Sequence, residues 1–415
     1  MDYYINKIGN DSNTGISIQS PWRSIDRINS TQLNAGDSVW FQAHQTFKGN
    51  LILSGLDIEC SDKPITFRSY GEGRATINAG NGSGLLCCNS HGVHIIDLNF
   101  VGDGTDRNNG SGIRFVNTLP DHKKLTNIRI EKVEISGFKN TGICIAAEPI
   151  DGTWSGFSNV KITHANIHDN GDAGINCYGI WNPEHEGYSH QDIYISSCQV
   201  YRNEGLPGKA THTGNGIVLA QVDGGIIEYC QVYENGRLNS SDEGGPVGIW
   251  AWDSNQVLIQ CNESHHNRTG SSKDGAGFDL DGGVQNSMVQ YNYSHDNDGA
   301  GFLLAQFDGA RAYHSNIIRY NLSENDGRNN TYGGIHFWST GANGGIRNIT
   351  IYRNKVITRK AVNGNPVAVD CVSKGIQNIR FYNNAFITDG KVSHIRGKSN
   401  PAVIFEDNAC LFINN

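Results

Sequence analysis

The chain has 415 residues, of which 37% are hydrophobic and 18% charged, a composition typical of a globular protein. It carries 33 Lys and Arg against 41 Asp and Glu, and the net charge of −8 argues against binding to nucleic acid. The sequence has no run of about 18 apolar residues, so no membrane-spanning helix is predicted.

The first residues, MDYYINKIGN, lack the charged and apolar regions of a signal peptide. We expect a secreted or periplasmic bacterial protein whose export signal is absent from this sequence. The segment SPWRSIDRINS predicts a short capping helix, with Ser20 as the N-cap and Pro21 at the first helical position. Trp22, Ile25 and Ile28 recur at helical spacing, so the helix is expected to cover one end of the core.

A strand-like segment that opens with glycine and an apolar residue recurs along most of the chain. A second strand follows each copy, and most of these second strands end at an asparagine. Short period-two strands at regular spacing predict a solenoid in which each coil adds one rung. The first strands are GIRFV at 112, GICIA at 142, GINCY at 174, GIVLA at 216, GIWAW at 248, GFDLD at 277, GFLLA at 301 and GIHFW at 334.

Two columns of identical residues are predicted along this stack. Side-chain amides that bond from rung to rung suit asparagine, which also tolerates the left-handed conformation. Cys198, Cys230 and Cys261 align as well, with Tyr291 next, and such stacked thiols are predicted to be buried and free rather than disulfide-bonded. The asparagine column contains Asn170, Asn203, Asn235, Asn267, Asn297 and Asn325.

The segments YYINKIGNDSNTGISIQSPWRSIDRI, AGDSVWF and ITFRSYGEGRATI resemble the start of many bacterial β-helix proteins of the pectate-lyase-like superfamily. The resemblance covers nearly the whole chain. It implies an all-β, single-domain right-handed parallel β-helix over residues 1–415, with an N-terminal cap region at 1–50 and coils at 51–415. That superfamily includes polysaccharide lyases, glycoside hydrolases, epimerases and non-catalytic proteins. The polygalacturonase signatures NTD, GHG and RIK are absent, so their catalytic residues are not transferred.

Within each glycine-led strand, the residue after glycine and the one two positions later are predicted to face the core. The alternating positions are then predicted to face solvent. Large exposed apolar patches mark binding sites, and flat aromatic rings suit sugar faces, so we interpret this face as a carbohydrate groove. The outward positions are Arg114, Cys144, Ala146, Asn176, Tyr178, Val218, Ala220, Trp250, Trp252, Asp279, Asp281, Leu303, Ala305, His336 and Trp338.

Asp279 and Asp281 are the predicted catalytic pair, with the roles of acid and base left open. Residues two apart on a strand share a face and lie about 6.5 Å apart. Carboxylates about 6.5–9.5 Å apart suit an inverting glycosidase. Asp253, on the preceding coil, is predicted to raise the pKa of a neighbouring carboxyl by like-charge repulsion, and Asp308 is predicted to approach from the following coil.

These residues predict a glycoside hydrolase that acts on a polysaccharide or oligosaccharide and requires no cofactor. The loops at 179–192 and 204–215 are expected to form walls of the groove, with Glu184, His185, Glu186 and Tyr188 reaching over it. The predicted substrate-binding residues are Asn176, Tyr178, Trp250, Trp252, Gln306, His336, Trp338, His212 and Lys209.

Two other interpretations remain open. In a calcium-assisted polysaccharide lyase or epimerase, Asp253, Asp279 and Asp281 would bind Ca²⁺, and the resemblance implies that such an ion holds a uronate. Lys209, His212 or Arg311 would then be the candidate base. In a non-catalytic carbohydrate-binding β-helix, the aromatic residues would bind sugar and the acids calcium. No nucleic-acid or membrane partner is expected, and the sequence does not set the oligomeric state.

Overall fold

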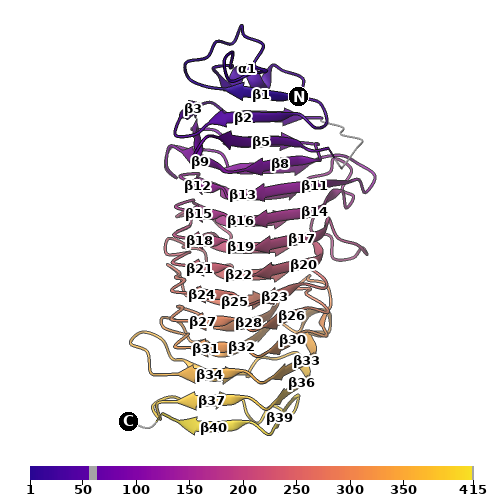
Figure 1. Ribbon diagram of the computed structural model, residues 1–415. Helices are drawn as coiled ribbons and strands as arrows, with labels where there is room; N and C mark the ends of the chain where they lie inside the picture. Colours follow the sequence, from indigo (N-terminus) through magenta and orange to yellow (C-terminus); the bar gives the residue numbers. More distant parts are fainter. Residues whose placement is uncertain (56–62, 414–415) are drawn as a thin grey trace. The chain divides into compact units, whose positions relative to one another are not determined.

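The computed structural model describes residues 1–55 and 63–413, whose contacts form two compact units. The first contains Met1–Ile180 and Ser189–Val200, and the second Trp181–Tyr188 and Tyr201–Asn415. In each unit every strand lies beside the equivalent strand of the next coil, and the strands form three parallel sheets, here called A, B and C (Figure 1). Parallel crossovers of this kind are right-handed, so the fold is the right-handed parallel β-helix that the sequence predicts.

The first unit contains the early strands of all three sheets. Sheet A contains β1 (Asp2–Ile5), β2 (Ser38–Gln42), β5 (Ile65–Tyr70), β8 (Val93–Ile96), β11 (Lys124–Glu131), β14 (Gly156–Thr163) and β17 (His190–Ser196). Sheet B contains β3 (Thr46–Lys48), β6 (Ala75–Gly80), β9 (Leu98–Gly102), β12 (Glu134–Ser136) and β15 (Asn166–His168). Sheet C contains β4 (Leu51–Ser54), β7 (Leu85–Cys88), β10 (Ile113–Asn117), β13 (Thr141–Ala147) and β16 (Ala173–Tyr178). The chain passes to the second unit within β18 (Gln199–Tyr201).

The second unit contains the later strands. Sheet A contains β20 (Val222–Glu228), β23 (Leu258–Gln260), β26 (Met288–Gln290), β30 (Ile317–Arg319), β33 (Ile346–Tyr352), β36 (Ile376–Tyr382) and β39 (Val403–Glu406), with β29 (Tyr313–His314) beside β33. Sheet B contains β21 (Gln231–Tyr233), β24 (Glu263–His265), β27 (Tyr293–His295), β31 (Leu322–Glu324), β34 (Lys355–Thr358), β37 (Ala385–Thr388) and β40 (Ala409–Phe412). Sheet C contains β19 (Asn215–Ala220), β22 (Val247–Trp252), β25 (Ala276–Leu280), β28 (Phe302–Gln306), β32 (Gly333–Ser339), β35 (Val367–Asp370) and β38 (Ile395–Arg396). A 3-10 turn, η1 (Ala342–Gly344), precedes β33.

The predicted N-terminal helix is present as α1 (Ile25–Asn29), but it begins later than the sequence suggests. Its N-cap is Ser24, whose Oγ accepts the N–H of Arg27, so the expected start at Pro21 is wrong. The carboxylate of Asp11 accepts the backbone N–H groups of Arg23 and Ser24, which holds them outside the helix. Among the described residues, no helix is long and apolar enough to cross a membrane.

The predicted inward positions of sheet C are confirmed in the second unit. Strand neighbours stack in register along the solenoid, and the rings of Phe278 and Phe302 lie 5.1 Å apart, nearly parallel. Each of the six positions singled out is at most 1% exposed: Ile249, Ala251, Phe278, Leu280, Ile335 and Phe337.

The asparagine column in the second unit is confirmed for its first members. The side chains of Asn203, Asn235, Asn267 and Asn297 bond in sequence, with amide-to-carbonyl distances of 3.0–3.1 Å. Asn325 is not in this column, because Asn297 donates to Asp326 at 2.8 Å instead. Asn325 and Asp326 are consecutive residues. Asp326 occupies the ladder position, and Asn325 occupies the position with a left-handed backbone, with φ of 55°.

The prediction that the cysteines form no disulfides is confirmed for the described residues, but the predicted alignment of Cys261 with Cys198 and Cys230 is wrong. Cys198 and Cys230 are buried and not disulfide-bonded, as are the other buried cysteines of the described residues, whereas Cys60 lies outside them. Cys261 is displaced from the column, because the N–H of Cys230 bonds to Asn262, one residue further on. Cys261 itself is half-buried, with φ of 55°.

Candidate active site

A pocket of about 730 Å³ lies over the outward face of sheet C in the second unit, a size common for small-molecule sites. Strands β22, β25, β28 and β32 supply most of its floor, and the loops before β19, β22, β25 and β32 supply its walls, together with Phe307 just after β28. The floor contains Trp250, Trp252, Asp279, Asp281, Leu303, Ala305, His336 and Trp338. The walls contain His212, Asp242, Glu243, Gly244, Ser272, Lys273, Asp274, Phe307, Asn329, Asn330, Thr331 and Tyr332.

The prediction that the outward positions face solvent is wrong for most of them. The loops before β22, β25 and β32 fold over sheet C, which buries the apolar floor and leaves a pocket instead of an open groove. Trp338 remains 45% exposed. The buried outward residues are Val218, Ala220, Trp250, Asp279, Leu303, Ala305 and His336 in the second unit, with Cys144 and Ala146 in the first.

Asp279 is the most unusual group in the pocket. It lies on β25 in register between Trp250 of β22 and Leu303 of β28, and it is 3% exposed. No hydrogen-bond donor among the described residues reaches its Oδ1. Burial raises the pKa of Asp279 well above its usual value, and the nearby charges of Asp281 and Asp274 raise it further. Burial and these charges therefore favour the protonated form of the Asp279 carboxyl.

Two further carboxyls lie close to Asp279 in the chain. Asp281, just after β25, accepts the N–H of Gly282 at 2.7 Å. Burial raises the pKa of Asp281 to about 7, with the charge of Asp274 adding to the effect and the Gly282 bond opposing it. Asp274 accepts the hydroxyl of Tyr332 at 2.9 Å and the N–H of Gly245 at 2.8 Å, and burial raises its pKa too. The pocket thus has three carboxyls with raised pKa values.

His336 is a buried neutral imidazole beside these acids. Its Nδ1 lies 3.3 Å from the backbone nitrogen of Gly333 and 3.5 Å from a carboxylate oxygen of Asp370. Burial lowers the pKa of His336 to about 4, although the Asp370 charge opposes that shift. The ring of Tyr332 lies 4.7 Å away. His336 therefore lines the pocket as a polar, uncharged group.

His212 is the one residue of the 204–215 loop that lines the described pocket. Its ring meets the indole of Trp250 edge-on at 5.0 Å, and its Nδ1 lies 3.0 Å from the Asn215 amide nitrogen. Lys209 donates to the carbonyl of His212 at 3.4 Å and does not line the pocket. The predicted wall is thus present, with His212 rather than Lys209 at the pocket.

Several predicted site residues lie elsewhere in the second unit. Asp253 is 1% exposed and forms an ion pair with Arg311 at 2.6 Å, so Asp274, not Asp253, is the acid whose charge raises its neighbours' pKa values. Asp308 is exposed in a turn and does not line the pocket. Gln306 is fully buried, where it accepts from Gly283 and donates to the carbonyl of Arg311.

Asn176 and Tyr178 belong to the first unit and are absent from the pocket lining. The hydroxyl of Tyr178 donates to Glu148 at 2.5 Å and lies 3.3 Å from a guanidinium nitrogen of Arg114. These bonds engage Tyr178 within its own unit. The interpretation of both residues as sugar contacts therefore has no support from the pocket.

The 179–192 loop contributes differently from the prediction. The indole of Trp181 packs on Trp252 at 6.5 Å and on Phe307 at 5.9 Å, so it supports two pocket residues from outside. Tyr188 lies beneath the guanidinium of Arg311 at 4.6 Å. Glu184, His185 and Glu186 are exposed and do not line the pocket.

Asp274 and Tyr332 were not singled out by the sequence. Asp274 lies in the connection KDGAG immediately before the strand that carries Asp279, and Tyr332 lies in the equivalent connection before His336. The acid-rich loop SSDEGG, which supplies Asp242 and Glu243, likewise precedes β22. A search of the connections just before the aromatic and acidic strands would have found all of these residues.

The fold and the pocket define a parallel β-helix protein with a carboxyl-lined pocket over one sheet. No family model matches the chain. The structure is similar to that of a GH136 lacto-N-biosidase from Eubacterium ramulus, with a TM-score of 0.68 at 19% identity over 99% of this chain and 68% of that one. It is also similar to the pectate lyase Pel9A, with a TM-score of 0.52 at 15% identity over 91% of this chain and 78% of that one.

By sequence, the chain is similar to a lacto-N-biosidase from Bifidobacterium longum subsp. longum. The two are 24% identical over 86% of this chain, which spans 28% of the length of that protein. The likeness to the two solved structures establishes the parallel β-helix fold that the N-terminal segments suggest.

Proposed function

We propose that the chain is a glycoside hydrolase that acts on an oligosaccharide or polysaccharide. The observation that carries this proposal is the buried carboxyl of Asp279, which lines a pocket, has a pKa raised well above its usual value and has an oxygen that no described donor reaches. Acid catalysis of glycosidic cleavage needs a carboxyl that keeps its proton, which a raised pKa favours. The likeness to two lacto-N-biosidases supports the same class of reaction.

In the proposed reaction Asp279 is the general acid. It donates its proton to the glycosidic oxygen as the bond from that oxygen to the anomeric carbon breaks. Asp281, whose pKa is about 7, is ionised in half or more of the molecules above neutral pH and is the proposed base that takes a proton from the attacking water. Asp274 raises the pKa of Asp279 by its charge, and Tyr332 positions Asp274 by its hydrogen bond.

Hydrolysis is favoured over elimination by the charges around the pocket. A lyase needs a cation or a basic residue beside the uronate carboxylate. Lys273 is the single Lys or Arg among the described residues that line the pocket, and it is exposed. Of the three candidates for a lyase base, Lys209 and Arg311 do not line the pocket, whereas His212 does. We propose that catalysis requires no calcium, and we keep inversion at the anomeric carbon as a prediction that NMR of the first product would test.

A screen of oligosaccharides and polysaccharides is expected to give new reducing ends without near-ultraviolet absorbance, in EDTA as well as without it. Asp281→Asn is expected to lower the rate by about 10²–10⁴-fold, because the base is lost. Asp308→Asn is the matched control, since Asp308 is an exposed aspartate outside the pocket. Rising absorbance that EDTA abolishes would identify a lyase. Loss of activity in Asp308→Asn would show that Asp308 belongs to the active site after all.

The pH profile of kcat/KM is expected to rise through about pH 7, as Asp281 ionises, and to fall at higher pH, as Asp279 loses its proton. Asp274→Asn removes a negative charge that raises both pKa values, so it is expected to move both limbs to lower pH. Initial rates between pH 4 and 10 would measure this. A rising limb near pH 4 would contradict Asp281 as the base.

A further inference from the structure

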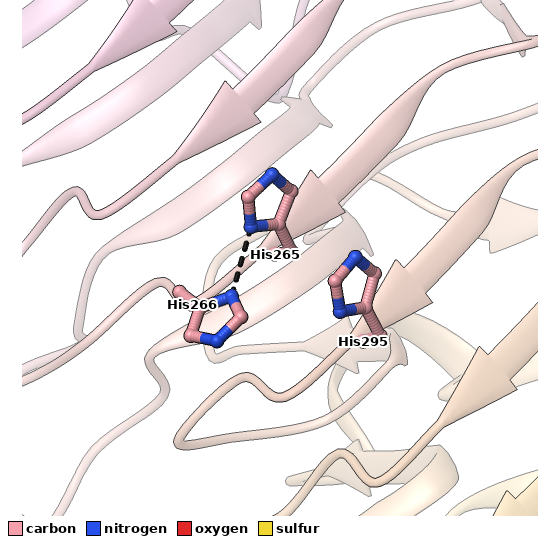
Figure 2. A group of neighbouring side chains, drawn as sticks. All are labelled: His265, His266 and His295. Atoms are coloured by element: carbon pink, nitrogen blue, oxygen red, sulfur yellow. Dashed lines mark hydrogen bonds between the residues drawn. The ribbon is translucent and has the colours of Figure 1, made fainter.

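Three histidines cluster on sheet B of the second unit, and none of them lines the pocket. His265 ends β24, His266 follows it, and His295 ends β27 in the next coil (Figure 2). One ring nitrogen of each lies within 4.8 Å of the others. Three imidazoles this close together are a potential ligand set.

The β-helix repeat itself brings these side chains together. His265 and His295 are register partners on adjacent strands, and their rings stack at 4.6 Å and 9°. The next residue of each coil has a left-handed backbone, with φ of 53° at His266 and 54° at Asp296. That turn directs the His266 ring edge-on toward the other two, with centroids 5.1 and 5.6 Å away.

The contact between His265 and His266 involves two atoms of the same kind. Their Nδ1 atoms lie 2.8 Å apart (Figure 2, dashed line). Two lone pairs at this distance repel, so a proton or a shared cation must lie between them. Imidazole nitrogens are preferred ligands of Zn²⁺, Cu²⁺ and Ni²⁺.

Carboxylates around His295 favour a bound cation. One ring nitrogen of His295 lies 2.9 Å from a carboxylate oxygen of Asp296, and the other lies 3.2 Å from Glu263. Histidines that bind metals commonly keep their second nitrogen on a carboxylate, which fixes the ring orientation. His295 can therefore bind an ion through one nitrogen, which then exchanges its carboxylate contact for the ion, while the other nitrogen keeps its carboxylate partner.

We propose that His265, His266 and His295 bind one divalent transition-metal ion of the zinc class, which joins two adjacent coils. Three histidine ligands leave a fourth position for water or a carboxylate. The ion would stabilise the folded chain by mass action, because the unfolded chain does not hold the three rings together. Its role is structural and separate from the pocket.

Metal-stripped, untagged protein is expected to bind one equivalent of Zn²⁺ in competition with a chromogenic chelator. Co²⁺ is expected to give visible absorption bands of a nitrogen-ligated site. His265→Gln and His266→Asn are expected to lower the affinity at least 100-fold, and asparagine is chosen at 266 because it tolerates positive φ. Circular dichroism would establish that both variants fold.

His168→Gln is the matched control. His168 ends β15 and lies 2.6 Å from Asp169 and 3.5 Å from Glu134, so it reproduces the carboxylate surroundings of His295. This control is expected to keep one equivalent of Zn²⁺ and the rise in Tm that Zn²⁺ causes. No stoichiometric binding by the unmodified chain, or binding that survives in both cluster variants, would overturn the proposal. Neither readout depends on glycosidase activity.

Discussion

Replacing Asp279 with asparagine is expected to lower kcat/KM on a natural glycoside by about 10²–10⁴-fold. The amide keeps the shape of the carboxyl but has no acidic proton for the departing oxygen. On an aryl glycoside with an acidic phenol as leaving group, the loss in bond cleavage is expected to be much smaller, since such a group departs without protonation. Steady-state rates on the two substrate types would measure the difference. An equal loss on both would instead make Asp279 the base or a nucleophile.

The same substitution is expected to stabilise the protein above neutral pH. The folded-state pKa of Asp279 is raised, so the folded chain keeps a proton that the unfolded chain loses. The contribution of this carboxyl to the free energy of unfolding is therefore fully present below its pKa in the unfolded chain. It is lost as the pH rises through its pKa in the folded chain. The Tm advantage of Asp279→Asn is expected to be larger at pH 8 than at pH 5. Asp308→Asn, at an exposed position, is expected to show no such trend.

The inward faces of the coils could be predicted from sequence because strand periodicity alone sets them. The errors at Cys261 and Asn325 are both displacements of a single residue. At the ends of these strands, a position in an amide ladder and a position with positive φ are consecutive, and asparagine suits both. Residue type therefore does not distinguish the two columns, whereas the hydrogen bonds do.

Asp279 and Asp281 both line the pocket, as their spacing in the sequence suggests, although Asp281 lies just after β25 instead of on the strand. Their burial was not predictable, because it depends on loops whose path no repeat determines. Tyr332 and Asp274 are 58 residues apart and meet only because both loops cover the same sheet face. Asp253 was predicted to act on a neighbouring carboxyl through its negative charge. That charge is instead paired with Arg311, a residue 58 positions further along the chain.

Replacing Arg311 with methionine is expected to lower the free energy of unfolding by about 3–5 kcal/mol, because it leaves a buried charge uncompensated. Arg311 is 6% exposed and its Nε lies 2.6 Å from the carboxylate of Asp253. It also donates to the carbonyl of His185 at 2.9 Å and lies over Tyr188. Its loss is therefore expected to release the 181–188 loop as well, and with it Trp181, which packs on pocket residue Trp252.

A double-mutant cycle with chemical denaturation would separate these two effects. Asp253→Asn combined with Arg311→Met is expected to be more stable than Arg311→Met alone, since no charge then remains buried. Any KM increase that the double variant retains would report the released loop. Arg237→Met is the control, because Arg237 pairs with Glu204 at the surface, where ion pairs contribute little. If Arg311→Met destabilised the chain no more than Arg237→Met, the Asp253–Arg311 pair would not be the internal support proposed for the loop and the pocket.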